Sequence, residues 1–170
     1  MAKEAYIEID GKRTQLTVEQ MKTLGIYEEP KANANPFERV EKNEIFYFIN
    51  DCGMIGESND CRGFFQNKVL DIANYCTDKK LMQQRALHET LNRLLWRFSM
   101  ENDGSKINWN NIDQRKYLIY FDNESKKFSI TDYRFMKVDG CIYFYSKSIA
   151  QKAIDEIVRP FMRRNPDFIW

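Results

Sequence analysis

The sequence is poor in the side chains on which most catalytic and metal sites depend. Its 170 residues include one histidine, His88, so a Ser-His-Asp or Cys-His arrangement has only one possible base. The four cysteines match neither C-x-x-C redox sites nor the paired ligands of structural zinc, and a zinc site of Cys52, Cys61 and His88 would require two long loops to converge. We therefore expect reduced cysteines and a histidine on a helix surface.

The common phosphate-binding and catalytic sequence motifs are absent as well. Seven glycines are spread along the chain without forming a phosphate-cradling loop, and the Walker A, G-x-G-x-x-G, G-x-S-x-G and H-E-x-x-H motifs do not occur. Asp51, Glu57 and Asp60 lie in the acidic segment 41–66 and could bind Mg²⁺ for hydrolysis, but solvated loop charges are much commoner. We therefore expect a protein that is not an enzyme and that uses no cofactor or metal.

Long hydrophobic runs and net charge are also missing. No stretch approaches the ~18 apolar residues that span a bilayer, and the first ten residues have no signal-peptide core, so we expect a cytoplasmic protein. The net charge of +1 is a sum of opposed halves: residues 1–66 carry 8 basic and 12 acidic side chains, and residues 67–170 carry 18 and 13. This distribution disfavours mimicry of DNA by the whole surface and favours docking through one face.

Alternation and turn signals predict a small ββα unit at the N-terminus. Asp10-Gly11 is the signal of a two-residue hairpin turn between strands over 6–10 and 13–16. Thr17 and Gln20 have the spacing of a capping box for a short helix over 18–24.

Composition divides the chain into three parts. We predict that the ββα unit covers residues 1–27, that a linker with two prolines covers 28–36, and that one main domain covers 37–170.

Further strands are predicted in the main domain. Aromatic and β-branched residues predict hairpins over 45–49 with 54–57 and over 116–121 with 126–130, and a strand over 141–145. Residues 58–66 are predicted to be irregular, and 69–73 are either helix or strand. In the last strand the inward set is either Ile142 and Phe144 or Cys141, Tyr143 and Tyr145, so some tyrosines should face outward.

Two long helices complete the predicted fold. The strongest periodic signal predicts a helix over 78–99 with Thr77 as its N-cap and with one apolar face, formed by Leu87, Leu91, Leu94, Leu95 and Phe98. A second helix starts after Ser146 and reaches Pro160, which should end or kink it. The expected class is α+β, with antiparallel hairpins and two main helices packed on one face.

The long helix also carries a basic stripe. Arg85, Glu89, Arg93 and Arg97 follow one another at i+4 along one face. One interpretation is a solvated face in which Glu89 bridges Arg85 and Arg93, and the other is a surface for a phosphate backbone or an acidic protein.

The C-terminus is the second candidate contact region. Apolar residues at a terminus usually dock onto a core or a partner, and this tail ends in three of them. We therefore predict partner contacts from the stripe and the tail, by Arg85, Arg93, Arg97, Arg163, Arg164 and Trp170.

Three segments carry a resemblance. They are Ile7-Glu-Ile-Asp-Gly-Lys12, Asn35-Pro-Phe-Glu-Arg-Val-Glu-Lys42 before Phe46-Tyr-Phe-Ile49, and Ile142-Tyr-Phe-Tyr-Ser146 followed by Ile149–Ile157. In these segments the chain resembles a family of small phage and prophage proteins of Firmicutes, over nearly its whole length. The motifs are structural, so the resemblance implies a shared fold and a mobile-element origin and carries over no catalytic residue. The 50–66 segment and the aromatic tail depart from the family pattern and are candidates for target recognition.

The resemblance leads to three functional hypotheses. Phage proteins of this size include anti-CRISPR and other anti-defence inhibitors, so the first hypothesis is an inhibitor that binds a host nuclease effector, or its nucleoprotein complex, and blocks it without catalysis. The second is a phage accessory protein that binds nucleic acid directly through the basic stripe and outward tyrosines. The third is a structural or assembly component of the virion.

Overall fold

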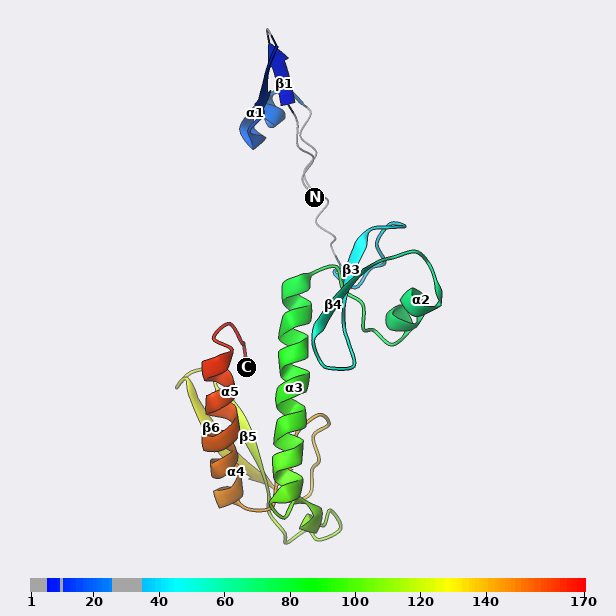
Figure 1. The fold of residues 1–170 in the computed structure, drawn as a ribbon. Helices are drawn as coiled ribbons and strands as arrows, with labels where there is room; N and C mark the ends of the chain where they lie inside the picture. The colour runs from blue at the N-terminus through cyan, green and yellow to red at the C-terminus, as the bar shows by residue number, and fades with distance from the viewer. Residues whose placement is uncertain (1–5, 10, 26–34) are drawn as a thin grey trace. The chain divides into compact units, whose positions relative to one another are not determined.

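The computed structural model describes residues 6–9, 11–25 and 35–170, and it has the predicted α+β class (Figure 1). The chain divides into two units, Met1–Glu38 and Arg39–Trp170, and each is described by itself. The linker predicted over 28–36 lies outside the described residues except for Asn35 and Pro36. In the described ranges, no helix combines the length and the apolar character that a membrane span requires.

The N-terminal unit is the predicted hairpin and short helix. Strand β1 (Tyr6–Ile9) pairs antiparallel with β2 (Lys12–Gln15), and α1 (Val18–Thr23) follows. The capping box is confirmed in both directions: the Gln20 amide donates to Thr17 Oγ1 at 3.3 Å, and the Thr17 amide donates to Gln20 Oε1 at 2.9 Å. Asp10 of the turn lies outside the described residues.

A second hairpin begins the larger unit and differs from the prediction in its length. Strand β3 (Ile45–Ile49) pairs antiparallel with β4 (Ile55–Asn59), and α2 (Phe64–Asp71) follows. The irregular segment predicted over 58–66 is therefore wrong at both ends, and 69–73 begins as helix. Ile45 pairs with Asn59, so the partner strand extends β4 where its own sequence, rich in polar residues, shows no strand pattern.

Both faces of this hairpin are covered. Phe46 is fully buried and stacks on Tyr75 with ring centroids 4.3 Å apart, whereas Ile49, on the opposite face, packs near Met82 of the long helix. Gly56 lies opposite Phe48, and a Cβ at Gly56 would come within 2.5 Å of the Phe48 ring. A side chain at this position of β4 would therefore displace the Phe48 ring, which glycine leaves in place.

Helix α3 (Lys79–Glu101) runs between this hairpin and the C-terminal sheet (Figure 1). Its N-cap is Asp78 and not the predicted Thr77, because the Asp78 carboxylate accepts from the amides of Lys80 and Leu81. Met82 packs toward the β3–β4 hairpin, and Leu91 packs into the C-terminal core. These two residues are nine positions apart, which places them on roughly opposite sides of the helix at about 100° per residue.

The C-terminal sheet has the order β6-β5-β7 and is antiparallel, with β5 (Lys116–Asp122), β6 (Lys127–Tyr133) and β7 (Tyr143–Phe144). Neither predicted alternation over 141–145 holds, because Tyr143 and Phe144 are both buried. Consecutive residues of a strand point to opposite faces, and both faces are covered here: Tyr143 packs edge-on against Trp109, while Phe144 belongs to the hydrophobic core.

The last helix continues through its proline. Ser146 caps α4 (Lys147–Ala153), as predicted, and a π-helical turn, Ile154–Val158, connects it to α5 (Arg159–Arg164) in one continuous column (Figure 1). Of the two expectations for Pro160, the end of the helix is wrong, and the α-helical register is instead interrupted by the π turn just before the proline. The wider π turn shifts the hydrogen-bond register before Pro160, so the proline stands in the first turn of a new α-helical segment.

A fully buried lysine joins two loops to the start of β5. The Lys116 ammonium donates to the carbonyl oxygens of Asn111 at 2.6 Å and Arg134 at 3.1 Å, and it lies 5.5 Å from the centre of the Trp109 ring. The loops before β5 and after β6 therefore meet at one cation.

A buried carboxylate fixes the chain around the β3–β4 hairpin. Asp60 is fully buried and accepts from Arg39 through both oxygens, at 2.6 and 2.9 Å, from the Tyr75 hydroxyl at 3.1 Å and from the Arg62 amide at 2.9 Å. The Arg39 guanidinium is the main reason that the pKa of Asp60 falls from 3.8 to about 2. Asp60 is thus a structural anion and not a loop carboxylate available to a metal.

Removal of this charge should destabilise the fold at neutral pH. Because the pKa of Asp60 is lowered on folding, its contribution is present above about pH 4 and is lost as the pH falls toward about 2. We expect Asp60→Asn to lower the free energy of unfolding by about 2 kcal/mol at pH 7, measured by urea denaturation, and the difference from wild type to shrink below about pH 4.

Glu57→Gln is the matched control. Its carboxylate lies 3.4 Å from the Lys79 ammonium, and both side chains are at least half exposed, so we expect a change within about 0.5 kcal/mol. An equal loss in both variants, or an unchanged acid dependence in Asp60→Asn, would contradict the anchoring role of Asp60.

Candidate interaction surface on helix α3

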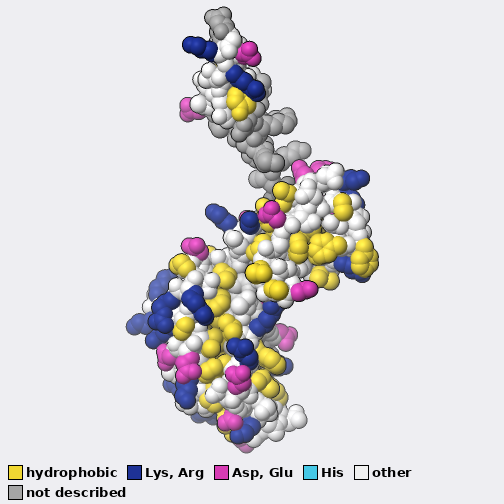
Figure 2. Space-filling model, in the orientation of Figure 1, with side chains coloured by type: hydrophobic (Ala, Val, Ile, Leu, Met, Phe, Trp, Pro, Cys, Tyr) yellow, Lys and Arg dark blue, Asp and Glu magenta, His cyan; other side chains and the backbone are white. Residues whose placement is uncertain are grey.

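The C-terminal half of α3 exposes two arginines, a tryptophan and a methionine on one face. Arg93, Trp96, Arg97 and Met100 follow the i, i+3, i+4, i+7 spacing of neighbours on a helix, and we call them the α3 outer stripe. Trp96 is 58% exposed and Met100 42%, while the side chains of Arg93 and Arg97 are 61% and 66% exposed. Figure 2 shows basic and hydrophobic side chains side by side on the surface of this unit.

The two cores explain why this face is exposed. Met100 is nine residues from Leu91, so the outer stripe lies opposite the face that packs on the C-terminal core. The outer stripe lies on the same side of α3 as Met82, which the β3–β4 hairpin covers in the N-terminal half of the helix. The hairpin reaches as far as Gly53 in its turn, where an added Cβ would lie 3.4 Å from Arg93 Nη1. Beyond this point the side chains of the outer stripe are exposed.

Glutamates neutralise part of the charge on this face. Glu89 accepts from Arg85 Nε and from Arg93 Nη2, each at 3.1 Å, and Arg97 Nε lies 4.0 Å from a Glu101 oxygen. The predicted bridge from Glu89 to two arginines is therefore present. Each arginine of the stripe has an acidic neighbour, so the face is only weakly cationic.

The predicted contact residues do not form one site. Arg85 also donates to the Ala73 carbonyl, which ties it to the end of α2. Arg163 and Arg164 are exposed on the last turn of α5, and Arg164 lines a groove of about 530 Å³ together with Gly53 and Thr90. Gly53 therefore lines this groove and also lies close to the Arg93 side chain.

The tail that contains Trp170 docks on the protein's own core. The Gln84 side chain donates to the Asp167 carbonyl at 2.7 Å and accepts from the Ile169 amide at 2.9 Å. Phe168 is buried between His88 and Phe161, and Trp170 is half-buried with its ring edge-on to Phe128 at 4.9 Å. Of the last three residues, Ile169 alone is largely exposed.

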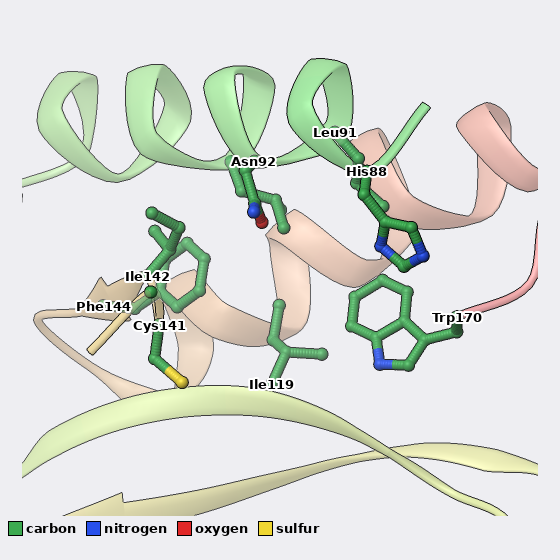
Figure 3. A pocket seen from close by; sticks show the side chains of 10 residues that line it. His88, Leu91, Asn92, Ile119, Cys141, Ile142, Phe144 and Trp170 are labelled. Atoms are coloured by element: carbon green, nitrogen blue, oxygen red, sulfur yellow. The ribbon is translucent and has the colours of Figure 1, made fainter. Parts of the chain in front are cut away.

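Trp170 and His88 also line a cavity of about 230 Å³ (Figure 3). In the described ranges, no three His, Cys, Asp or Glu side chains are grouped as a metal site requires. Cys52 and Cys61 are exposed free thiols, while burial raises the pKa of the Cys76 thiol. The side chains of the larger unit therefore offer exposed surfaces and a cavity as candidate sites.

Sequence reasoning missed Trp96 and Met100. The predicted stripe follows the i+4 row of arginines, whereas Trp96 and Met100 lie three residues after Arg93 and Arg97. That spacing is the signal that could have found them.

Comparison of the chain with protein-family models, with curated proteins and with solved structures found no match.

Substitutions at two adjacent residues of α3 test whether the outer stripe contributes to the stability of the fold. We expect Trp96→Ala to change the free energy of unfolding by less than about 0.5 kcal/mol, because the indole is largely exposed. Leu95→Ala, one position earlier on the buried face, should cost about 2–4 kcal/mol. Chemical denaturation measures both, and equal losses would show that Trp96 belongs to the core.

Proposed function

We propose that this protein is a non-catalytic inhibitor that binds a CRISPR-type effector nuclease of the host through the α3 outer stripe. The observation that carries the proposal is a largely exposed tryptophan, Trp96, between two exposed arginines on a helix whose opposite face is fixed in the core. Tryptophan and arginine are the residues most enriched among those that dominate protein–protein binding energy.

The rigidity of α3 favours binding. The helix has 23 residues, a side-chain N-cap and buried contacts at both ends. A partner would meet Trp96 on a backbone that is already ordered, so association would lose less conformational entropy than docking of a loop.

The charge pattern favours a protein partner over nucleic acid. Arg93 and Arg97 each lie beside a glutamate, which reduces the field available to a phosphate backbone but suits a surface of mixed charge. The class of target comes from the resemblance to phage and prophage proteins, since proteins of that origin include inhibitors of host defence.

Inhibition of nuclease cleavage tests the proposal. A panel of purified CRISPR effector nucleases loaded with guide RNA should contain at least one that the wild-type protein inhibits. We expect the double variant Trp96→Ala/Arg97→Ala to raise the half-inhibitory concentration by roughly 100-fold, at about tenfold for each lost anchor.

The chain offers a matched control away from the stripe. Arg159 is 59% exposed and pairs with Asp155 at i,i+4, as Arg97 pairs with Glu101, and Ile169 is a 70% exposed apolar residue. Arg159→Ala/Ile169→Ala should change inhibition less than about threefold. Inhibition of no nuclease in the panel, or equal losses in the two double variants, would contradict the proposal.

Direct nucleic-acid binding is the competing hypothesis, because an exposed tryptophan between two arginines also suits the stacking of a base. This hypothesis predicts that the protein binds generic DNA with an affinity that falls steeply with log[salt]. Arg93→Ala/Arg97→Ala would then reduce that slope by about two, and this result would replace the inhibitor proposal.

A further inference from the structure

Apolar side chains form several walls of the cavity beside α3, and polar groups form the rest of its lining. Leu91 and Leu95 come from α3, Ile119 from β5, Ile142 and Phe144 from the segment around β7, and Trp170 from the tail. Figure 3 shows Ile119 opposite the helix, the Trp170 ring at one end and Ile142 with Phe144 at the other.

The volume of this cavity sets the size of the ligand that it can hold. It lies at the edge of the C-terminal core and is open on one side. An apolar cavity of about 150 Å³ is already large enough to bind benzene. The cavity here measures about 230 Å³, which exceeds one unsubstituted aromatic ring and leaves room for a small substituent.

Two polar side chains of α3 stand at the rim. The Asn92 amide points toward the cavity, and no described residue makes a hydrogen bond to it, so it can both donate to and accept from an occupant (Figure 3). The His88 imidazole lies beside Trp170 and packs at a tilt against the Phe168 ring, with centroids 4.7 Å apart. Since His88 and Asn92 are both exposed residues, the cavity opens to solvent along α3.

We propose that this cavity is a binding site for a single aromatic ring that carries one small polar substituent, with the ring between Ile119 and Trp170 and the substituent at the Asn92 amide. The apolar walls recognise the ring, and the amide recognises a hydroxyl or amino group. The site is independent of the α3 outer stripe and does not depend on the proposed function. The ring can belong to a free small aromatic compound or to a tyrosine side chain of another protein.

A titration followed by NMR tests the site in the full chain. p-Cresol, a phenol with the shape of a tyrosine side chain, should shift the indole N–H resonance of Trp170 at millimolar concentration and leave that of Trp96, on the outer stripe, unchanged. N-acetyltyrosinamide distinguishes the two sources: a matching Trp170 shift assigns the site to a protein side chain, and p-cresol binding alone assigns it to a free aromatic compound.

Filling the cavity provides the decisive variants. Ile119→Phe places a ring inside it, so this variant should keep or raise the melting temperature and weaken p-cresol binding by more than tenfold. Ile130 is the direct cross-strand neighbour of Ile119 and packs on the same core without lining the cavity, so Ile130→Phe should lower the melting temperature by overpacking. The proposal is overturned if p-cresol leaves the Trp170 resonance unshifted, or if Ile119→Phe binds p-cresol like wild type.

Discussion

The larger unit depends on one helix that is buried on opposite sides at its two ends. Met82 and Ala86 complete the small core under the β3–β4 hairpin, and Leu91, Leu95 and Phe98 complete the larger core under the C-terminal sheet. Each core therefore covers only part of the helix circumference. The face buried under the hairpin ends near the residue at which the face buried under the C-terminal sheet begins. The exposed face of α3 is a direct consequence, because the hairpin covers its side of the helix only as far as Arg93.

Polar anchors hold the segments that the hydrophobic cores do not reach. Asp60 gathers Arg39, Arg62 and Tyr75 around the end of β4, and Lys116 joins the carbonyl groups of Asn111 and Arg134. Both ions are fully buried, and each is satisfied by several partners, which is the condition under which a buried charge is compatible with a stable fold. The loops around β4 and β5 are therefore ordered by charge and hydrogen bonds where their sequences lack apolar periodicity.

The two binding features that we infer both include residues of α3, on different sides of the helix. The cavity lies beside Leu91 and Leu95, on the side that packs on the C-terminal core, whereas the outer stripe lies on the opposite side. His88 and Asn92 border the cavity, and Trp96 is largely exposed beside the arginines of the outer stripe. A helix fixed by two cores thus presents a cavity and a mixed-charge surface without requiring either to stabilise the fold.

Local patterns in the sequence determined the α+β class, the hairpins, the capping box of Thr17 and Gln20, the extent of α3 and the Ser146 cap, because each depends on side chains within a few residues.

Tertiary contacts decided the rest. Pairing with Ile45 extends β4 to Asn59, core packing buries both Tyr143 and Phe144, and a π turn carries the last helix past Pro160. The predicted arginines lie at the expected spacing, yet only the folded chain ties Arg85 to Ala73 and docks Trp170 on the core, while Trp96 remains exposed. Which side of a helix faces solvent depends on what packs against it, and those partners are distant in the sequence.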